Sequence, residues 1–271
     1  MKSYRKEFYE NPELWKTDYH DIQVERERIQ EIKKIIPLDA GSILDVGCGN
    51  GFFINSLINS GHRYDKLVGL DISKEALKYV KTEKVQGTII DLPFESSSFD
   101  LITCLEVLEH LPCEDLLKGI LELQKVSRKY ILVTVPNGEG LERSLVRCPE
   151  CYCWFNPGLH MRSFNKEKLQ YIFKDFKLIV FEEMGPKSQK EAFLSYLPIL
   201  FYRWKKPLPP ENSVCPQCGY FYKRDQSKKV HEQLHRLNLK KVLILLVRFL
   251  GIIIGHPEGK SYWLLALYER K

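Results

Sequence analysis

The sequence predicts an α/β protein in which helices flank a seven-stranded mixed, mostly parallel sheet. Short apolar segments alternate with segments of helical spacing, a glycine-rich turn follows the first apolar segment, and acidic residues lie where predicted strands end. The chain has 271 residues, enough for one such domain with insertions, and a charged fraction of 28% is ordinary for a folded protein.

The first elements follow from spacing and turn residues. Asp21–Ile36 places isoleucines at helical intervals, and Pro37 ends this predicted helix. Ser42–Val46 is a short apolar strand, and the turn Gly47–Gly51 leads from it into a helix over Phe52–Ser60.

The next elements repeat this unit. Lys66–Leu70 is a second strand, and Ser73 is a suitable N-cap for a helix over Lys74–Lys81. The apolar segments Thr88–Ile90 and Phe99–Cys104 are expected to be the third and fourth strands.

The remaining elements extend to the end of the chain. Helical spacing is expected over Glu106–Leu111, Leu116–Val126 and Asn165–Phe173, and strands over Tyr130–Val135, Phe176–Glu182 and Ser261–Tyr268. The segment between the last two strands is too long for a hairpin and therefore predicts an inserted subdomain.

Four parts of the chain follow from this pattern. They are an N-terminal helical segment (1–40), a ligand-binding core (41–184) with a cysteine turn at 148–160, an inserted subdomain (185–260) and a final core strand (261–271).

Composition excludes several classes of protein. The net charge of +6 is too small to indicate nucleic-acid binding by itself. The charged, aromatic start is unlike a secretion signal. The apolar run Val242–Gly255 contains Arg248 and is shorter than the roughly 20 residues of a membrane-spanning helix. A cytoplasmic location is therefore expected, and paired cysteines in such a chain indicate metal binding rather than disulfides.

The glycine turn and the acids near it predict a ligand site. Glycines at 47, 49 and 51 allow a ligand to approach the backbone, and Asp71 follows Gly51 by 20 residues, where an acid can accept from ribose hydroxyls. Asp45 precedes the turn, where it would repel a pyrophosphate but attract an ammonium group. This favours S-adenosylmethionine over a dinucleotide.

These residues resemble the class I S-adenosylmethionine-dependent methyltransferases, and in particular their ubiquinone-pathway members. The resemblance covers about Ser42–Asn137 and is carried by six segments: Leu44–Gly51, Val68–Ser73, Asp91–Phe94, Ser98–Asp100, Leu105–His110 and Val133–Asn137. It implies a Rossmann-like methyltransferase fold, methyl transfer, and a lid formed by the N-terminal helical segment 1–40.

The resemblance also implies roles for individual residues. The cofactor-binding set is Asp45, Gly47, Cys48, Gly49, Gly51, Asp71, Ile72, Asp91, Leu92, Leu105 and Glu106. In this set Asp45 and Gly47 take the methionine end, Asp71 takes the ribose hydroxyls, and Asp91 with the Leu92 amide reads the adenine edge.

Two Cys-x2-Cys turns predict a structural zinc site. Cys148 and Cys151 form one turn, Cys215 and Cys218 form the other, and Zn²⁺ prefers four such ligands in a tetrahedron. Cys153 is an extra thiol that could replace Cys148 or Cys151. The competing interpretation is two unrelated pairs of reduced thiols.

A second cluster has candidate catalytic residues. On a helix, Glu106, Glu109 and His110 would share one face, able to bind Mg²⁺ or Mn²⁺ together with His160, or to transfer protons. His110, His160 and Glu106 are the catalytic candidates. The set resembles the metal site of small-RNA 3′-end 2′-O-methyltransferases, although no second His accompanies His160.

Basic and apolar segments in the insertion leave the partner open. Arg203–Lys206 and Lys223–Lys241 are basic, and they are expected to be a solvated face or, alternatively, a surface for phosphate-bearing partners. The apolar segments 193–204 and 237–254 are expected to form the core of the insertion, with peripheral membrane contact as the alternative.

The sequence therefore predicts a methyltransferase acting on the oxygen or carbon of a small-molecule, lipid-linked or sugar-linked acceptor. One alternative is a metal-dependent RNA 2′-O-methyltransferase. The other is a non-catalytic module of the same fold that binds its partner through the zinc turns.

Overall fold

The computed structural model describes residues 6–16, 22–58, 60–187, 209–210, 213–222, 259 and 261–271. The chain divides into two compact units. Unit 1 comprises Met1–Leu141, Leu159–Pro186 and Ser261–Lys271, and unit 2 comprises Glu142–Gly158 and Lys187–Lys260.

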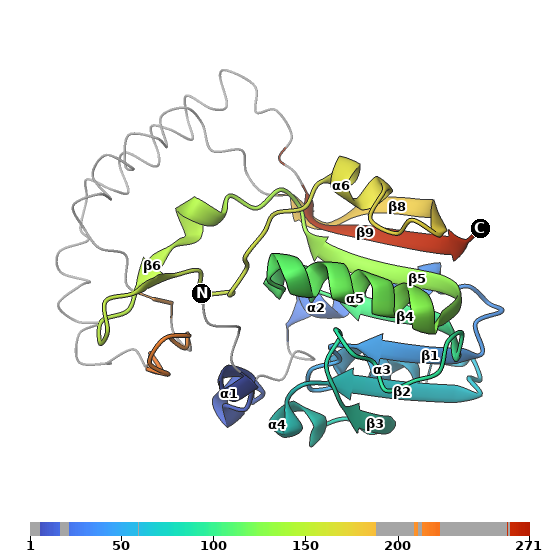
Figure 1. The fold of residues 1–271 in the computed structure, drawn as a ribbon, viewed down its shortest axis with the longest axis horizontal. Coiled ribbons are helices and arrows are strands. Elements are labelled where there is room, and N and C mark those ends of the chain that lie inside the picture. The colour runs from blue at the N-terminus through green and yellow to red at the C-terminus, as the bar shows by residue number, and fades with distance from the viewer. Residues whose placement is uncertain are drawn as a thin grey trace. The chain divides into compact units, whose positions relative to one another are not determined.

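A seven-stranded sheet organises unit 1, with the strand order β3-β2-β1-β4-β5-β9-β8 (Figure 1). Its strands are β1 (Ser42–Val46), β2 (Lys66–Asp71), β3 (Glu83–Gln86), β4 (Phe99–Leu105), β5 (Ser127–Pro136), β8 (Phe176–Lys187) and β9 (Ser261–Arg270). Pairing from β3 through β5 is parallel, and β9 runs antiparallel to β5. The predicted Rossmann-like mixed sheet is confirmed.

Unit 1 also contains helices. They are α1 (Lys6–Tyr9), α2 (Gln23–Ile35), α3 (Phe52–Leu57), α4 (Lys74–Leu77), α5 (Cys113–Val126) and α6 (Lys166–Gln170), with the short 3₁₀ turns η1 (Pro12–Leu14), η3 (Leu108–His110) and η4 (Leu141–Ser144), the last at the boundary with unit 2. The side chains of Ser73 and Asn165 accept from backbone amides at the starts of α4 and α6, as N-caps do.

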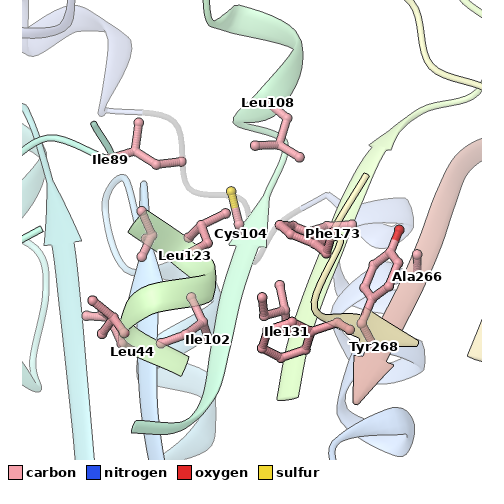
Figure 2. Packing of buried hydrophobic residues seen from close by; sticks show 14 of the residues in the cluster. Leu44, Ile89, Ile102, Cys104, Leu108, Leu123, Ile131, Phe173, Ala266 and Tyr268 are labelled. Atoms are coloured by element: carbon pink, nitrogen blue, oxygen red, sulfur yellow. The ribbon is translucent and has the colours of Figure 1, made fainter. Parts of the chain in front are cut away.

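Side chains alternate between two cores, one on each face of the sheet. Leu44 and Ile102 belong to one buried cluster, and their neighbours Ile43 and Leu101 belong to the other. In Figure 2, Leu44, Ile102 and Ile131 lie in the first cluster, which also contains Leu123 of α5. The second cluster receives the buried face of α2 and α3. Burial on both faces explains why the central strands are almost uniformly apolar.

Predicted bounds differ most at the sheet edge. The third strand is Glu83–Gln86 and not Thr88–Ile90. β3 is an edge strand with mainly exposed side chains, so it lacks the apolar pattern on which the prediction depended. The apolar residues after it form a turn closed by the Asp91 N–H donating to the Thr88 carbonyl at 3.2 Å.

Unit 2 contains the cysteines of both Cys-x2-Cys turns and a two-stranded sheet. Strands β6 (Val146–Arg147) and β7 (Trp154–Phe155) are antiparallel, and an isolated antiparallel bridge joins Val214 to Phe221. The segments 193–204, 203–206, 223–241 and 237–254 discussed above lie outside the described residues.

In the part of the chain that the structure describes, no helix combines the length and apolar character needed to span a bilayer. The predicted cytoplasmic location stays a prediction.

Candidate functional site

The glycine turn lies at the carboxyl end of β1, next to the end of β2. Gly47 has a φ of +76° and Gly51 a φ of +80°, both in the left-handed region that glycine adopts without strain. The amides of Gly47 and Cys48 donate to the Leu70 carbonyl at 2.7 and 3.0 Å. A Cβ on Gly47 would lie 2.5 Å from a Val107 methyl carbon, so the turn also needs the small size of glycine.

Asp71 is the last residue of β2, and backbone amides orient its carboxylate. Oδ1 accepts from the Ser73 amide and Oδ2 from the Gly49 amide, each at 2.8 Å. Burial raises the pKa of Asp71, and these hydrogen bonds oppose that shift. The glycine turn and the second strand therefore share one oriented carboxylate.

Asp45 lies beneath the turn and is buried. Burial raises its pKa to about 7, with a hydrogen bond from Thr103 opposing the shift and the charge of Asp71 adding to it. Such a carboxylate is poised to gain a cationic partner, because a nearby positive charge would favour its ionised form.

A cavity of about 400 Å³ opens over these residues. Its lining includes nine of the residues predicted from sequence for the cofactor or for catalysis: Asp45, Gly47, Cys48, Gly49, Asp71, Ile72, Leu105, Glu106 and His110. The volume is in the range of small-molecule sites.

Four predicted site residues lie outside this lining: Gly51, Asp91, Leu92 and His160. Asp91 is exposed, and the Leu92 amide donates at 2.9 Å to the Glu122 carboxylate. Thr88, Ile89 and Ile90 line the wall where Asp91 and Leu92 were expected. The earlier end of β3 accounts for this difference.

Four lining residues from the N-terminal segment were not predicted as site residues. Tyr9 and Trp15 are joined by a 2.7 Å hydrogen bond from Trp15 Nε1 to the Tyr9 carbonyl, and Ser73 Oγ donates to the same carbonyl at 2.7 Å. The other two are Arg28 and Ile29 of α2. The aromatic character of residues 4–19 was the available sequence signal for Tyr9 and Trp15.

Arg28 brings a positive charge to a mainly acidic site. Its guanidinium lies 5.0 Å from the Trp263 ring centroid, pairs with Glu25 at 2.8 Å and lies 3.8 Å from Glu106 Oε1. Nothing in its helical spacing separates it from the surface arginine Arg26, so sequence alone could not single it out.

The prediction that Glu106, Glu109 and His110 share one face of a helix is wrong. Glu106 has a φ of +56°, and only Leu108–His110 form a single 3₁₀ turn. The chain therefore leaves β4 through a left-handed residue instead of entering a helix directly. Three possible metal-binding atoms nevertheless lie within 4.8 Å of one another, one each on Glu109, His110 and His160. Glu106 is not in this group.

Buried polar atoms make this cluster unusual. Both carboxylate oxygens of Glu109 and Nδ1 of His110 are buried without a hydrogen-bond partner. The His110 and His160 rings meet edge to face at 4.9 Å, and Nδ1 of His160 pairs with Glu139. The donor set could transfer protons or hold a divalent cation.

Burial controls the ionisation of the cluster. It lowers the pKa of His110 to about 4, with a further lowering from His160, and raises the pKa of Glu109, an effect that Glu106 reinforces. Burial also raises the pKa of Glu106, and the Arg28 charge opposes this. His110 is therefore neutral at neutral pH and can accept a proton.

The cysteines predicted to bind zinc lie together in unit 2. Four sulfur atoms lie within 4.8 Å of one another, those of Cys148, Cys151, Cys215 and Cys218. Cys153 is close to this group, 3.5 Å from Cys151 and 3.3 Å from Cys215, sulfur to sulfur. Residues far apart in sequence thus converge on one thiol cluster.

Comparisons with known proteins agree with the fold. Residues 44–130 match the methyltransferase domain family. The chain is 27% identical over 167 residues to a ubiquinone biosynthesis O-methyltransferase of Xylella fastidiosa, covering 49% of this chain and 67% of that protein. It is 35% identical over 103 residues to an uncharacterised protein of Methanocaldococcus jannaschii, covering 36% of this chain and only 42% of that one.

Solved structures show the same fold at low sequence identity. A chain from the complex of the Haloferax volcanii Trm112 methyltransferase activator with a methyltransferase has a TM-score of 0.54 at 14% identity, covering 96% of this chain and 98% of its own. A SAM-dependent methyltransferase of Thermotoga maritima has a TM-score of 0.52 at 15% identity, covering 98% of each chain. The chain therefore has the fold of these methyltransferases, and its residues 44–130 match the methyltransferase domain family.

Proposed function

We propose that the chain transfers the methyl group of S-adenosylmethionine to a hydroxyl oxygen of a small-molecule acceptor. The observation that carries this proposal is the position of His110, which lines the same cavity as Asp45 and Asp71. Its neutral imidazole can take the proton of a hydroxyl group as the oxygen attacks. Relatives named as O-methyltransferases of ubiquinone biosynthesis support oxygen as the attacked atom.

The cavity residues fit the cofactor by their chemistry. Asp45 is a buried carboxylate that suits the ammonium group of the methionine end, and the Asp71 carboxylate suits the ribose hydroxyls. Ile72, Ile89 and Ile90 offer apolar walls for the adenine. When bound, S-adenosylmethionine supplies an electrophilic methyl group for in-line displacement.

Arg28 completes this assignment. The methionine end of the cofactor carries a carboxylate as well as an ammonium group, and Arg28 is a cation in the cavity lining. Its guanidinium is held between Glu25 and Trp263, which orients it and leaves less side-chain entropy to be lost on binding. We assign Arg28 to the carboxylate.

The N-terminal segment is assigned the role of a lid. Tyr9 and Trp15 line the cavity, and the Glu10 carboxylate accepts from the amides of Lys74 and Glu75 at the start of α4, both at 3.1 Å. These bonds attach the lid to the element that follows Asp71. Closing water out of the cavity would favour transfer by strengthening the interactions inside it.

The proton acceptor is His110, and His160 supports it. Proton uptake makes the His110 ring positive, and the negative charge of Glu139 opposes the lowering of the His110 pKa by burial and by His160. Glu139 in turn pairs with His160, so the two rings share one carboxylate neighbour. Glu106 lines the cavity next to His110 and would face the acceptor.

One observation favours a second candidate, a metal-dependent enzyme such as an RNA 2′-O-methyltransferase. The donors of Glu109, His110 and His160 lie within 4.8 Å, and both Glu109 oxygens lack a protein partner. Mg²⁺ or Mn²⁺ would satisfy these atoms and would orient the attacking oxygen.

A transfer assay on separated fractions distinguishes these functions. The purified chain is incubated with methyl-labelled S-adenosylmethionine and the small-molecule, lipid, RNA and protein fractions of a cell extract. We expect label in the small-molecule or lipid fraction, and at least ten-fold less with His110→Gln. Label in RNA alone would replace the proposal with the second candidate. Cofactor binding with no label in any fraction would indicate a non-catalytic module.

Zinc is proposed as a second, structural cofactor. The clustered thiols belong to unit 2, whereas the residues lining the cavity belong to unit 1. Zn²⁺ with four thiolate ligands has no open position for a substrate. Zn²⁺ at the cluster would therefore stabilise unit 2 without taking part in the transfer.

A further inference from the structure

The two cysteine turns of unit 2 have the same backbone geometry. In the first, the Cys148 amide donates to the carbonyl of Cys153 at 2.9 Å, and the Tyr152 amide donates to the Cys148 carbonyl at 3.1 Å. In the second, the Cys215 amide donates to the carbonyl of Tyr220 at 2.9 Å.

The match extends to the flanking residues. The Gly219 amide donates to the Cys215 carbonyl at 2.9 Å, as Tyr152 does in the first turn. Tyr152 and Gly219 both have left-handed backbone, with φ of 62° and 74°. Each turn is closed by an antiparallel pair in the same register, Arg147 with Trp154 and Val214 with Phe221.

This equivalence identifies the corresponding positions in the two turns. Cys148 corresponds to Cys215, and Cys151 corresponds to Cys218. In both turns the first cysteine is buried and the second is exposed. Cys153 corresponds to Tyr220, a residue without a thiol. Four thiols therefore have counterparts and the fifth does not.

The sulfur distances fit one tetrahedral ion. Zn–S bonds of 2.3 Å imply ligand sulfurs ~3.8 Å apart. Across the two turns, Cys148 and Cys218 are 3.7 Å apart and Cys151 and Cys215 are 3.6 Å apart. Cys153 lies 3.3 Å from Cys215, which is closer than two ligands of the same zinc ion would be.

We propose that one Zn²⁺ is bound by Cys148, Cys151, Cys215 and Cys218, and that Cys153 is a reserve ligand able to replace Cys151. Its sulfur is 3.5 Å from that of Cys151 and 3.3 Å from that of Cys215, so it lies beside the position that Cys151 would vacate. This inference extends the proposed structural zinc by naming its ligands and the one ligand that can be exchanged.

Elemental analysis and cobalt substitution of the full chain test the proposal. The wild type should contain one zinc per chain, and Co²⁺ in its place should give the absorption of a four-thiolate site. Cys153→Ser should leave the zinc content and the Co²⁺ absorption spectrum unchanged. Cys151→Ser should keep the metal and the four-thiolate spectrum, with at least ten-fold weaker affinity in competition with a chromophoric chelator.

Three further variants complete the test. The double variant Cys151→Ser/Cys153→Ser and the single variant Cys148→Ser should lose the four-thiolate spectrum. Cys113→Ser, an exposed thiol outside the cluster, is the matched control. A wild type without zinc would overturn the metal site itself. A three-thiolate spectrum in Cys151→Ser, with an intact wild type, would overturn only the reserve ligand.

Discussion

Thr103 Oγ1 donates a 2.7 Å hydrogen bond to Asp45 Oδ1, and the two residues are direct partners in the register of β4 and β1. Both are buried. The sheet thus places a carboxylate under the glycine turn with one hydrogen bond and a pKa of about 7. A site with that carboxylate is sensitive to pH in the physiological range.

Affinity for S-adenosylhomocysteine should fall as the pH decreases below about 7. Protonation of Asp45 removes the charge that is proposed to attract the ligand ammonium group, so the affinity falls by at most ten-fold per pH unit. Calorimetry between pH 5.5 and 8.5 measures the slope. Asp45→Asn should bind S-adenosylhomocysteine weakly, and its affinity should change less with pH. If the affinity of that variant changed with pH as steeply as that of the wild type, another group would be responsible for the pH dependence.

The same carboxylate predicts the pH dependence of stability. The folded pKa of Asp45 exceeds the unfolded value of about 3.9, so the folded state binds the proton more tightly. The contribution of Asp45 to the free energy of unfolding is therefore lost as the pH rises from about 4 to about 7. Denaturant titrations of the ligand-free chain should show a smaller decline over that range for Asp45→Asn than for the wild type.

Asp71→Ala should lower the affinity for S-adenosylhomocysteine by at least ten-fold. The substitution removes the proposed acceptor of the ribose hydroxyls and the acceptor for two backbone amides. Asp39→Ala is the control, since Asp39 is a surface carboxylate paired with Lys129. Equal affinities for the two variants would place the ribose elsewhere.

Much of the fold was predictable because its central strands are buried on both faces. β1, β2, β4 and β5 each contain a run of mainly apolar residues, and each was expected within a few residues of its bounds. β3 was misplaced because an edge strand with exposed side chains has no such run. Hydrophobic pattern therefore located the interior of the sheet better than its edge.

The candidate site was predictable where a residue's place in the sheet decides its role. Asp45, Asp71 and the glycines follow from strand ends and turn chemistry. Arg28 depends on the packing of α2 against β9, and the left-handed backbone of Glu106 depends on the exit of the chain from β4. Long-range packing of this kind leaves no periodic pattern in the sequence.

Arg28→Gln should lower the affinity for S-adenosylhomocysteine by at least ten-fold and leave the affinity for methylthioadenosine unchanged. The second ligand has the same nucleoside but lacks the amino-acid end that Arg28 is proposed to bind. Arg26→Gln, an exposed position on the same helix, is the matched control. Equal losses for both ligands would mean that Arg28 supports the cavity as a whole.

Tyr268→Phe should reduce the free energy of unfolding by ~1 kcal/mol without altering cofactor affinity. The buried Tyr268 hydroxyl donates to the Leu169 carbonyl at 2.7 Å, and its ring packs edge to face on Phe173 (Figure 2). The variant keeps the ring and leaves the carbonyl with only its backbone donors, the amides of Tyr171 and Ile172. Tyr171→Phe changes an exposed ring and should have no measurable effect in the same denaturant titration.

Methyl transfer should persist in chelator if His110 acts as the base. His110→Gln should then lower kcat by ~10²-fold or more with little change in KM for S-adenosylmethionine, because the proton acceptor is lost and the cofactor end of the cavity is kept. Glu114→Gln, an exposed carboxylate at the start of α5, is the control. Three results would contradict this prediction together: transfer is lost in chelator, it recovers with Mg²⁺ or Mn²⁺, and Glu109→Gln no longer binds Mn²⁺. They would show that the buried Glu109 oxygens and His110 coordinate a metal ion. Zinc content measured in the same samples separates this effect from loss of the thiol-bound ion.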